Sequence, residues 1–434
     1  MTTCNNKRGL NRFHHFWACS LLAVTMVGLT AVVGHAETLD ELLAEAMAGN
    51  SQTRALSLKA DALRAESRFA RALPNPTVSL GLANLPLTGL SLNQEPMTQK
   101  QVAITQRFPW PGKRELAARM PLAQADGVDA EVDQRLLGLL HSVTTGYVEL
   151  WYQGERERLN IQLQEIVAEL TRSATGRYES GRETQQAVLK GELALIQLAE
   201  EKLVIEGMIR KAESRLSATL ERQGEKPITA DAAPKVPEVY PRNFWLDAAH
   251  DSPQRRRLEA MVTGRQAGHA LAKKAVLPDV GVKVAYGQRE DDDNGRGRDD
   301  FISMTFSFPV PLWRDAREES MVASQASQKR AAARSLSGYD ASLPHRIDGL
   351  LAEMETALSR YVLYRDRLVP KSRQLSEAQV SRYEVGAIGY DAMIKAVTET
   401  MRAEVMALRY LKEALVAESA LRTLAGLFPE GVSP

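Results

Sequence analysis

The sequence predicts a mainly α-helical chain made of two similar halves, each of which contains two β-strands. Three observations lead to this fold class. Long stretches are rich in Ala, Leu, Glu, Arg and Gln, four short segments alternate between apolar and polar residues, and three motifs recur in the same order about 200 residues further along. The near balance of 55 Lys and Arg against 54 Asp and Glu argues against a basic nucleic-acid-binding face, and two cysteines are too few for a disulfide framework.

The first 36 residues have the pattern of a secretory signal peptide. Three basic residues precede an apolar run, residues 16–33, and Gly34 and Ala36 then place small residues where a signal peptidase cuts. An uncleaved membrane anchor is the alternative, because the apolar run is just long enough to span a bilayer. We predict that residues 1–36 are removed on export, which leaves a mature chain without cysteine.

The first half, residues 37–223, is expected to begin with a helix that Thr38 and Glu41 cap at its start. Prolines end this helix, and period-two alternation then indicates strands that lead into a long helix and a return helix. The expected ranges are helix 38–72, strands of about 76–85 and 99–108, helix 113–177 and helix 184–220.

A Pro-rich linker, residues 224–242, leads to the second half, residues 243–428, and a short tail, residues 429–434, ends the chain. The second half repeats the first, with strands of about 279–287 and 301–308. Phe108-Pro109-Trp110-Pro111 returns as Phe308-Pro309-Val310-Pro311 at an offset of 200, and the Arg-Tyr-x-x-Gly motif returns at an offset of 205. Pro344 and Pro370 are expected to bend or break the long helix of this half.

The long helices carry apolar residues at the three- and four-residue steps of a coiled-coil seam. The residues expected in this seam are Leu159, Leu163, Ile166 and Leu170 in the first helix and Leu189, Leu193, Ile196 and Leu203 in the return helix. Such a seam is also compatible with a soluble periplasmic coiled-coil protein that has a structural or interaction role.

The four strands argue against that alternative, because one face of each is large and apolar while the other is small, polar or charged. Val78, Leu80 and Leu82 alternate with Ser79 and Gly81, for example. This alternation is typical of a transmembrane β-barrel. Four strands cannot close a barrel, and open edges are not tolerated in lipid, so the chain must assemble. A dimer would give eight strands and a trimer twelve, and the residues alone leave both open.

Taken together, these features resemble the TolC-type outer-membrane efflux proteins. The resemblance rests on the duplicated halves, on Leu73-Pro74-Asn75-Pro76 and Phe108–Arg114 around the strands, and on the repeated Arg-Tyr-x-x-Gly motif. It covers residues 38–427 and implies a homotrimer with a twelve-stranded β-barrel in the outer membrane and a long α-helical tunnel in the periplasm. The loop Gln94–Gln99 is most similar to the heavy-metal efflux branch of that family.

The resemblance also implies a function as a passive exit duct. The implied partners are an inner-membrane pump, a periplasmic adaptor (membrane fusion) protein and the lipid of the outer membrane, and the implied substrate is a heavy-metal cation. A drug or protein secretion duct of the same fold is the alternative. An enzyme is not expected, because the residues form no catalytic motif, and no cofactor is expected. The four histidines after residue 36, at positions 141, 250, 269 and 345, lack metal-ligand spacing.

Two kinds of site follow from the family's architecture. The turns between paired helices would receive the adaptor, and the matching residues here are Tyr178, Gly181, Arg182, Tyr383 and Gly386. Glycine in this position also has a structural explanation, since it permits the backbone that ends a helix. A periplasmic gate would lie just beyond the second turn, where Asp391 and Lys395 are four residues apart on one helix face.

Overall fold

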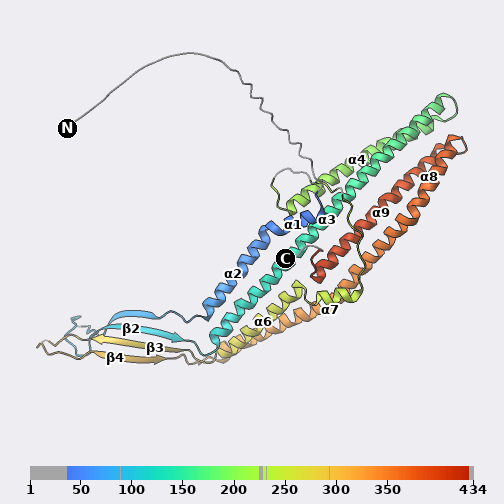
Figure 1. Cartoon of the computed structure of the whole chain (residues 1–434). Helices are drawn as coiled ribbons and strands as arrows, with labels where there is room; N and C mark the ends of the chain where they lie inside the picture. Colours follow the sequence, from blue (N-terminus) through green and yellow to red (C-terminus); the bar gives the residue numbers. More distant parts are fainter. Residues whose placement is uncertain (1–36, 88, 224–227, 231, 293, 430–434) are drawn as a thin grey trace, which may run out of the picture. The chain divides into compact units, whose positions relative to one another are not determined.

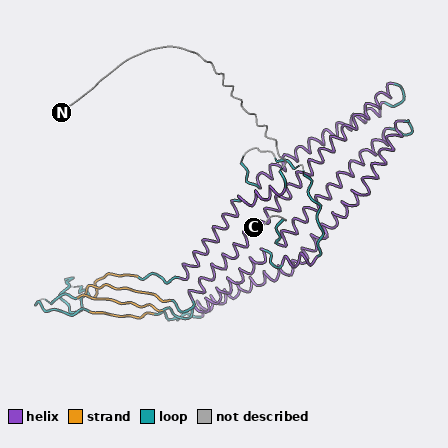
Figure 2. Tube along the Cα trace, viewed as in Figure 1, coloured by secondary structure: helices purple, strands orange, loops and turns teal. Residues whose placement is uncertain are grey.

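The computed structural model describes residues 37–429 apart from positions 88, 224–227, 231 and 293. The expected signal peptide, part of the linker and all but the first residue of the tail therefore lie outside the described residues. All described residues belong to one unit. Figure 1 shows its strands at one end of the helices and two helix turns, α3–α4 and α8–α9, at the opposite end. Figure 2 shows the same separation of strand from helix.

The two halves have the same order of elements. The first contains α1 (Leu39–Gly49), α2 (Ser51–Arg71), β1 (Thr77–Ala83), β2 (Gln99–Phe108), α3 (Lys113–Glu179) and α4 (Gln185–Thr219). The second contains α5 (Arg242–Ala249), α6 (Pro253–Lys274), β3 (Val280–Gln288), β4 (Phe301–Ser307), the π-helical segment η1 (Asp315–Glu319), α7 (Ser320–Leu363), the π-helical segment η2 (Tyr364–Leu368), α8 (Val369–Glu384) and α9 (Tyr390–Ala425).

The strands form one antiparallel sheet in the order β1-β2-β3-β4, so the central β2–β3 pair joins the two halves. Side chains of residues that are paired on neighbouring strands lie on the same face of the sheet. The register therefore aligns residues of similar character in rows across the four strands. One face has the rows Val78, Ile104, Val284, Met304 and Leu80, Val102, Tyr286, Ile302. The other face has the rows Ser79, Ala103, Ala285, Ser303 and Thr77, Thr105, Lys283, Thr305.

The apolar face of the sheet is not covered by the described chain. Its eight large side chains in these two rows are 42–79% exposed. No helix in the described part of the chain combines the length and the apolar character needed to cross a bilayer.

The Phe-Pro-Trp-Pro-Gly-Lys motif fastens the start of α3 to the start of β3. Asp279 Oδ1 accepts hydrogen bonds from the Trp110 N–H (3.0 Å) and from Lys113 Nζ (2.9 Å), and Lys113 Nζ also donates to the Leu277 carbonyl (2.6 Å). Gly112 has a φ of 81°, which lets the chain turn directly into the helix. The two halves are therefore tied together where the sheet meets the helices.

The helical part has two equivalent apolar cores, one in each half. Leu42, Leu140 and Tyr147 lie at the centre of the first, and Trp245 and Ile347 at the centre of the second. Each core unites the short first helix of its half with the long helices.

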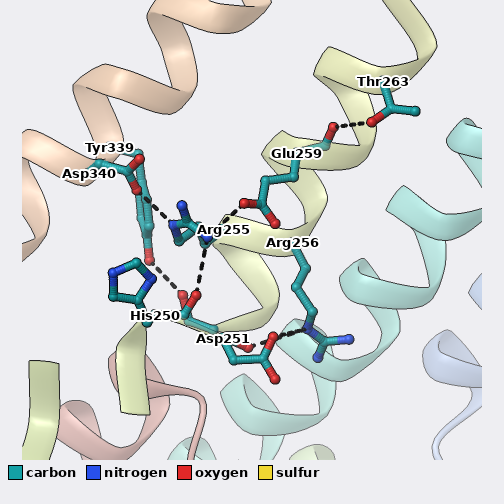
Figure 3. Close-up of polar contacts among 9 residues, drawn as sticks. His250, Asp251, Arg255, Arg256, Glu259, Thr263, Tyr339 and Asp340 are labelled. Atoms are coloured by element: carbon teal, nitrogen blue, oxygen red, sulfur yellow. Dashed lines mark hydrogen bonds and ion pairs between the residues drawn. The ribbon is translucent and has the colours of Figure 1, made fainter. Parts of the chain in front are cut away.

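A polar cluster ties α6 to both halves beside these cores (Figure 3). Arg255 donates to Asp340 of α7 (3.0 Å) and to Glu259 of its own helix (2.6 Å), whereas Arg256 donates to Asp133 of α3 (2.7 Å). Neighbouring arginines thus hold two different helices, and sequence analysis had not singled out either residue.

The expected single helix over residues 38–72 is wrong, since the chain forms α1 and α2 instead. Asn50 between them is extended, with φ −71° and ψ 118°. Its side-chain oxygen accepts hydrogen bonds from the N–H groups of Gln52 and Thr53, which starts a new helix. A good N-cap residue therefore overrides the continuous helical pattern around it.

The prolines of the second half behave differently from each other. α7 runs through Pro344 without a break, whereas the α-helical ladder gives way to η2 just before Pro370. The stretch from Asp315 to Glu384 has 70 residues, three more than α3, and it contains both π-helical segments. A π turn closes one residue later than an α turn, so the two segments absorb two of the three additional residues.

The residues of the expected coiled-coil seam on the return helix α4 do not pack within the chain. Its residues Leu189, Leu193, Ile196 and Leu203 are 54–67% exposed. α4 instead packs on α3 through the opposite face, where the buried residues are Ala187, Gly191, Leu198, Ile205, Ala212 and Leu216. The helix has two apolar faces with the same seven-residue spacing, and small residues on the second face allow the closer approach.

Candidate functional site at the two helix turns

The first helix turn ends α3 with a Schellman motif. Gly181 has a φ of 72°, the Gly181 N–H donates to the Tyr178 carbonyl (2.9 Å), and the Arg182 N–H donates to the Arg177 carbonyl (2.8 Å). Glycine occupies the left-handed position because it has no Cβ to clash there.

The second turn repeats this backbone. Gly386 has a φ of 75° and its N–H donates to the Tyr383 carbonyl (2.9 Å), while the Ala387 N–H donates to the Arg382 carbonyl (2.8 Å). The Arg-Tyr-x-x-Gly motif thus encodes the same helix ending twice.

The tyrosines of the two motifs have opposite surroundings. Tyr178 is 45% exposed, whereas Tyr383 is 1% exposed and packs among Ala174, Tyr390 and Met393. The rings of Tyr383 and Tyr390 meet edge to face, with centroids 5.9 Å apart. Tyr383 therefore holds the second hairpin against the first and is not available to a docking partner.

Arg177 of the first turn reaches across to the second. Its Nη1 donates to the carbonyl oxygens of Tyr383 and Glu384, both at 3.0 Å, and its guanidinium carbon lies 4.9 Å from the centre of the Tyr383 ring. These carbonyls end α8, where the helix dipole favours a positive charge. The guanidinium thus links the end of α3 to the end of α8.

Burial, with the Glu183 carboxylate nearby, raises the pKa of Tyr383 to about 12. Tyr383 Oη and Arg177 Nε are both enclosed, and neither has a hydrogen-bond partner within the described chain. Buried polar atoms without a hydrogen-bond partner lower the stability of the folded protein. The contact between the turns therefore depends on the Arg177 hydrogen bonds and on the packing of the Tyr383 ring.

Three helices meet beside Gly191 of α4. A Cβ at this position would clash with the Thr171 side chain of α3 and lie 2.8 Å from Tyr390 Oη of α9. Thr171 Oγ1 and Tyr390 Oη are themselves 3.3 Å apart. Gly191 is therefore required for α9 to lie against the α3–α4 pair.

The expected gate residues do not pair with each other. Asp391 Oδ2 instead forms an ion pair with Lys190 Nζ of α4 (2.6 Å), and Lys395 has no ion pair within the described residues. The side chains of Lys190 and Asp391 are 40% and 68% exposed. Asp391 thus joins the two hairpins through Lys190. Its four-residue spacing from Lys395 on α9 does not lead to an ion pair between those two residues.

Arg182, the remaining expected docking residue, is exposed at the first turn and donates from Nε to Ser180 Oγ (3.0 Å). Among the described residues, no group of three or more His, Cys, Asp or Glu side chains is placed to hold a metal ion. The contact between the two hairpins also depends on three residues for which the sequence alone predicts no role: Arg177, Lys190 and Gly191. Only Arg177 had a visible signal, as the first residue of the repeated motif.

No protein-family model matches the sequence, and no curated protein matches it closely enough to be counted as a relative. Solved structures do match. The outer membrane protein VceC of Vibrio cholerae aligns with a TM-score of 0.73 over 89% of this chain and 96% of its own, at 16% identity. The CmeC outer membrane channel of Campylobacter jejuni has a TM-score of 0.73 at 12% identity, over 91% of this chain and 87% of that one.

The open state of the Neisseria gonorrhoeae MtrE outer membrane channel also aligns with a TM-score of 0.73, over 90% of this chain and 89% of that one, at 15% identity. The chain has the fold of an outer-membrane channel. The turns of the paired helices and the uncovered sheet are both parts of this channel fold, because the alignments span about nine-tenths of the chain.

Proposed function

We propose that the chain is the protomer of an outer-membrane exit duct that passively conducts substrate out of the cell. The uncovered sheet carries this proposal. Its face of large apolar side chains is suited to lipid, and the opposite face of small and polar side chains is suited to the inside of a barrel. The channel fold of the structural neighbours supports the same function.

The duct would be a homotrimer. β1 and β4 are the edge strands of the sheet, and open edges in lipid leave backbone groups unpaired. Three copies would close a twelve-stranded barrel, as the resemblance to the TolC-type family implies, and the helices would then extend into the periplasm as a tunnel.

The two turns are the proposed docking site for the periplasmic adaptor, which would connect the duct to an inner-membrane pump. Tyr178, Gly181, Arg182 and Gly386 are exposed there. Val385, at 80% exposure, belongs with them. Tyr383 is left out of the proposed docking site, because it is buried under the second turn.

Heavy-metal cations are the proposed substrate. The support for this choice is the sequence resemblance of the loop Gln94–Gln99, and a duct for drugs or proteins would share every structural feature above. Loss of the gene should therefore sensitise cells to heavy-metal salts more than to drugs.

Cell fractionation and planar-bilayer recording together test the duct. The full-length protein should be recovered from the outer membrane as an oligomer that requires detergent, and it should form channels after reconstitution. Recovery as a soluble periplasmic monomer would contradict the proposal.

The contact between the hairpins is the proposed gate. The Lys190–Asp391 ion pair is exposed, and exposed ion pairs contribute at most about 1 kcal/mol. The hydrogen bonds of Arg177 to the end of α8 would therefore stabilise the closed state of the gate more than this ion pair does. Three copies of Asp391 around the axis would favour cations at the entrance. Asp391→Asn should therefore raise single-channel conductance and weaken cation preference. Lys395→Gln is the matched control on the same helix, and an equal response in both variants would place the gate elsewhere.

A further inference from the structure

The four strands of the sheet carry positive charges only. Lys100, Arg107 and Lys283 are their basic residues, and the strands contain no Asp or Glu. In the chain as a whole, 55 basic residues are nearly balanced by 54 acidic ones, so the sheet departs from the rest of the sequence. A β-barrel built from this sheet would therefore have a wall in which no carboxylate offsets the cations.

Lys283 of β3 lies on the face of the sheet that has small and polar side chains. It is paired with Thr105 on β2 and with Thr305 on β4. Side chains alternate along a strand, so the neighbouring Val282 and Val284 lie on the opposite, apolar face. In the proposed duct, the Lys283 ammonium group would thus face the inside of the barrel and not lipid.

No acidic group compensates the charge of Lys283 within the sheet. Lys283 makes no ion pair or side-chain hydrogen bond within the described residues. The acidic residue nearest to it along the chain is Asp279, four residues or about 13 Å away at 3.3 Å per residue. Asp279 is already bound by Lys113 (2.9 Å) and Arg107 (3.1 Å). Two cations share this one carboxylate, so the end of the sheet next to the helices is positive as well.

The acidic loop between β3 and β4 does not cancel the charge of Lys283 either. Its first carboxylate, Glu290, lies seven residues beyond Lys283, which is about 23 Å along an extended chain. The Debye length at physiological ionic strength is about 8 Å, so exposed charges at that separation are largely screened from each other. Glu290 is also paired with Lys100. The charges inside the barrel and at its outer end therefore act separately.

We propose that Lys283 determines the ion selectivity of the exit duct: three copies of it form a cationic ring that favours anions over cations inside the barrel. Three-fold symmetry places the copies at one height. Rings of Lys or Arg side chains favour anions in pores. The proposal rests on the proposed function, because it requires the closed barrel.

The ring has a consequence for the proposed substrate. Asp391 is expected to favour cations at the periplasmic entrance, whereas Lys283 favours anions at the exit. A metal ion that leaves as a neutral or anionic complex would therefore cross the barrel more readily than the bare cation.

Planar-bilayer recording of the full-length protein under a KCl gradient tests the ring. At about 0.01 M salt the Debye length is about 30 Å, so the charge of the ring acts across the lumen. Lys283→Gln should lower the permeability ratio of chloride to potassium several-fold, and Lys283→Glu should lower it further. Lys283→Arg is the matched control, because it keeps the charge and should keep the ratio. The effect of Lys283→Gln should shrink at about 1 M salt, where the Debye length is about 3 Å.

A relocated charge separates the position on the sheet from the residue itself. Thr305 is paired with Lys283, so Thr305→Lys combined with Lys283→Gln returns the charge to the same face at the same level. This double variant should recover the wild-type permeability ratio.

Chemical labelling tests whether Lys283 faces the lumen, because residues 37–434 contain no cysteine. In open channels of Lys283→Cys, a thiosulfonate reagent that carries an ammonium group should restore the wild-type permeability ratio. A reagent that carries a sulfonate group should lower the ratio further. Val284→Cys, on the apolar face of the same strand, is the matched control and should respond to neither reagent.

The outcomes distinguish the ring from the duct. Channels with the same permeability ratio in the wild type, Lys283→Gln and Lys283→Glu would overturn the ring and leave the exit duct standing. An equal response of Lys283→Cys and Val284→Cys to the reagents would overturn the placement of Lys283 in the lumen. If the wild-type protein formed no channels, the proposed function would fail, and the ring with it.

Discussion

The turn between α3 and α4 and the turn between α8 and α9 have the same backbone but different side-chain contacts. Both end a helix with a glycine in the left-handed conformation and the same two hydrogen bonds. In the first turn, however, Tyr178 is exposed and Arg177 reaches outward to its neighbour. In the second, Tyr383 is buried, and Arg382 makes no ion pair or side-chain hydrogen bond within the described residues.

The difference follows from how the hairpins are placed. Two similar hairpins that lie side by side in a head-to-tail manner touch through different surfaces, so equivalent residues acquire different surroundings. Local requirements, such as a glycine at the helix end, are kept in both copies. Contacts across the pair are free to diverge, and only one of the two motif arginines finds the end of a neighbouring helix.

The largest expected difference concerns the arginines. Arg177→Ala removes two hydrogen bonds from a charged donor and a cation–π contact, so it should lower the free energy of opening the second turn by about 2–4 kcal/mol. Arg382→Ala, at the equivalent exposed position, should change it by less than about 0.5 kcal/mol. Hydrogen exchange of the backbone amides of residues 384–390 measures both. Equal effects of the two variants would remove the asymmetry between the turns.

A smaller difference is expected for the glycines. Alanine at either position costs about 1 kcal/mol because of the positive φ. An added Cβ would meet nothing within 4 Å at Gly181 but would lie 3.3 Å from Arg177 Nη2 at Gly386. Gly386→Ala should therefore lower thermal stability more than Gly181→Ala. The excess should disappear in the Arg177→Ala background, and its persistence there would assign the cost to another neighbour.

The smallest effect is a titration. Burial raises the pKa of Tyr383 to about 12, above the value of about 10 for an unfolded tyrosine. Because the folded state disfavours the ionised form of Tyr383, the folded protein should keep its full stability below pH 10 and lose stability as the pH rises to about 12. Ultraviolet titration of the folded protein should show a late tyrosine that Tyr383→Phe removes and Tyr178→Phe retains. A late step that survives Tyr383→Phe would belong to another tyrosine.

Much of the channel fold could be predicted from local patterns. Period-two alternation indicates the strands, and the repeated motifs indicate the duplication, because both depend on nearby residues. The packing face of α4 could not be predicted in this way. Leu193 and Leu198 both belong to regular apolar stripes, and the choice between them depends on which helix lies alongside.

The candidate site shows the same limit. Gly181 and Gly386 follow from the motif, since a helix ending is a local event. The partner of Asp391 does not, because Lys190 is 201 residues away and no spacing rule connects them. Burial of one motif tyrosine and exposure of the other likewise depend on the neighbouring hairpin.

The π-helical segments η1 and η2 have a consequence for how the duplicated halves can change in length. The stretch from η1 through α8 has 70 residues and α3 has 67, yet both turns lie side by side. A residue inserted into an α-helix would normally rotate everything beyond it by about 100° and displace it by about 1.5 Å. A π turn accommodates an inserted residue locally. The two halves can therefore gain residues independently of each other. A partner that contacts both turns would still find them at the same height along the helices.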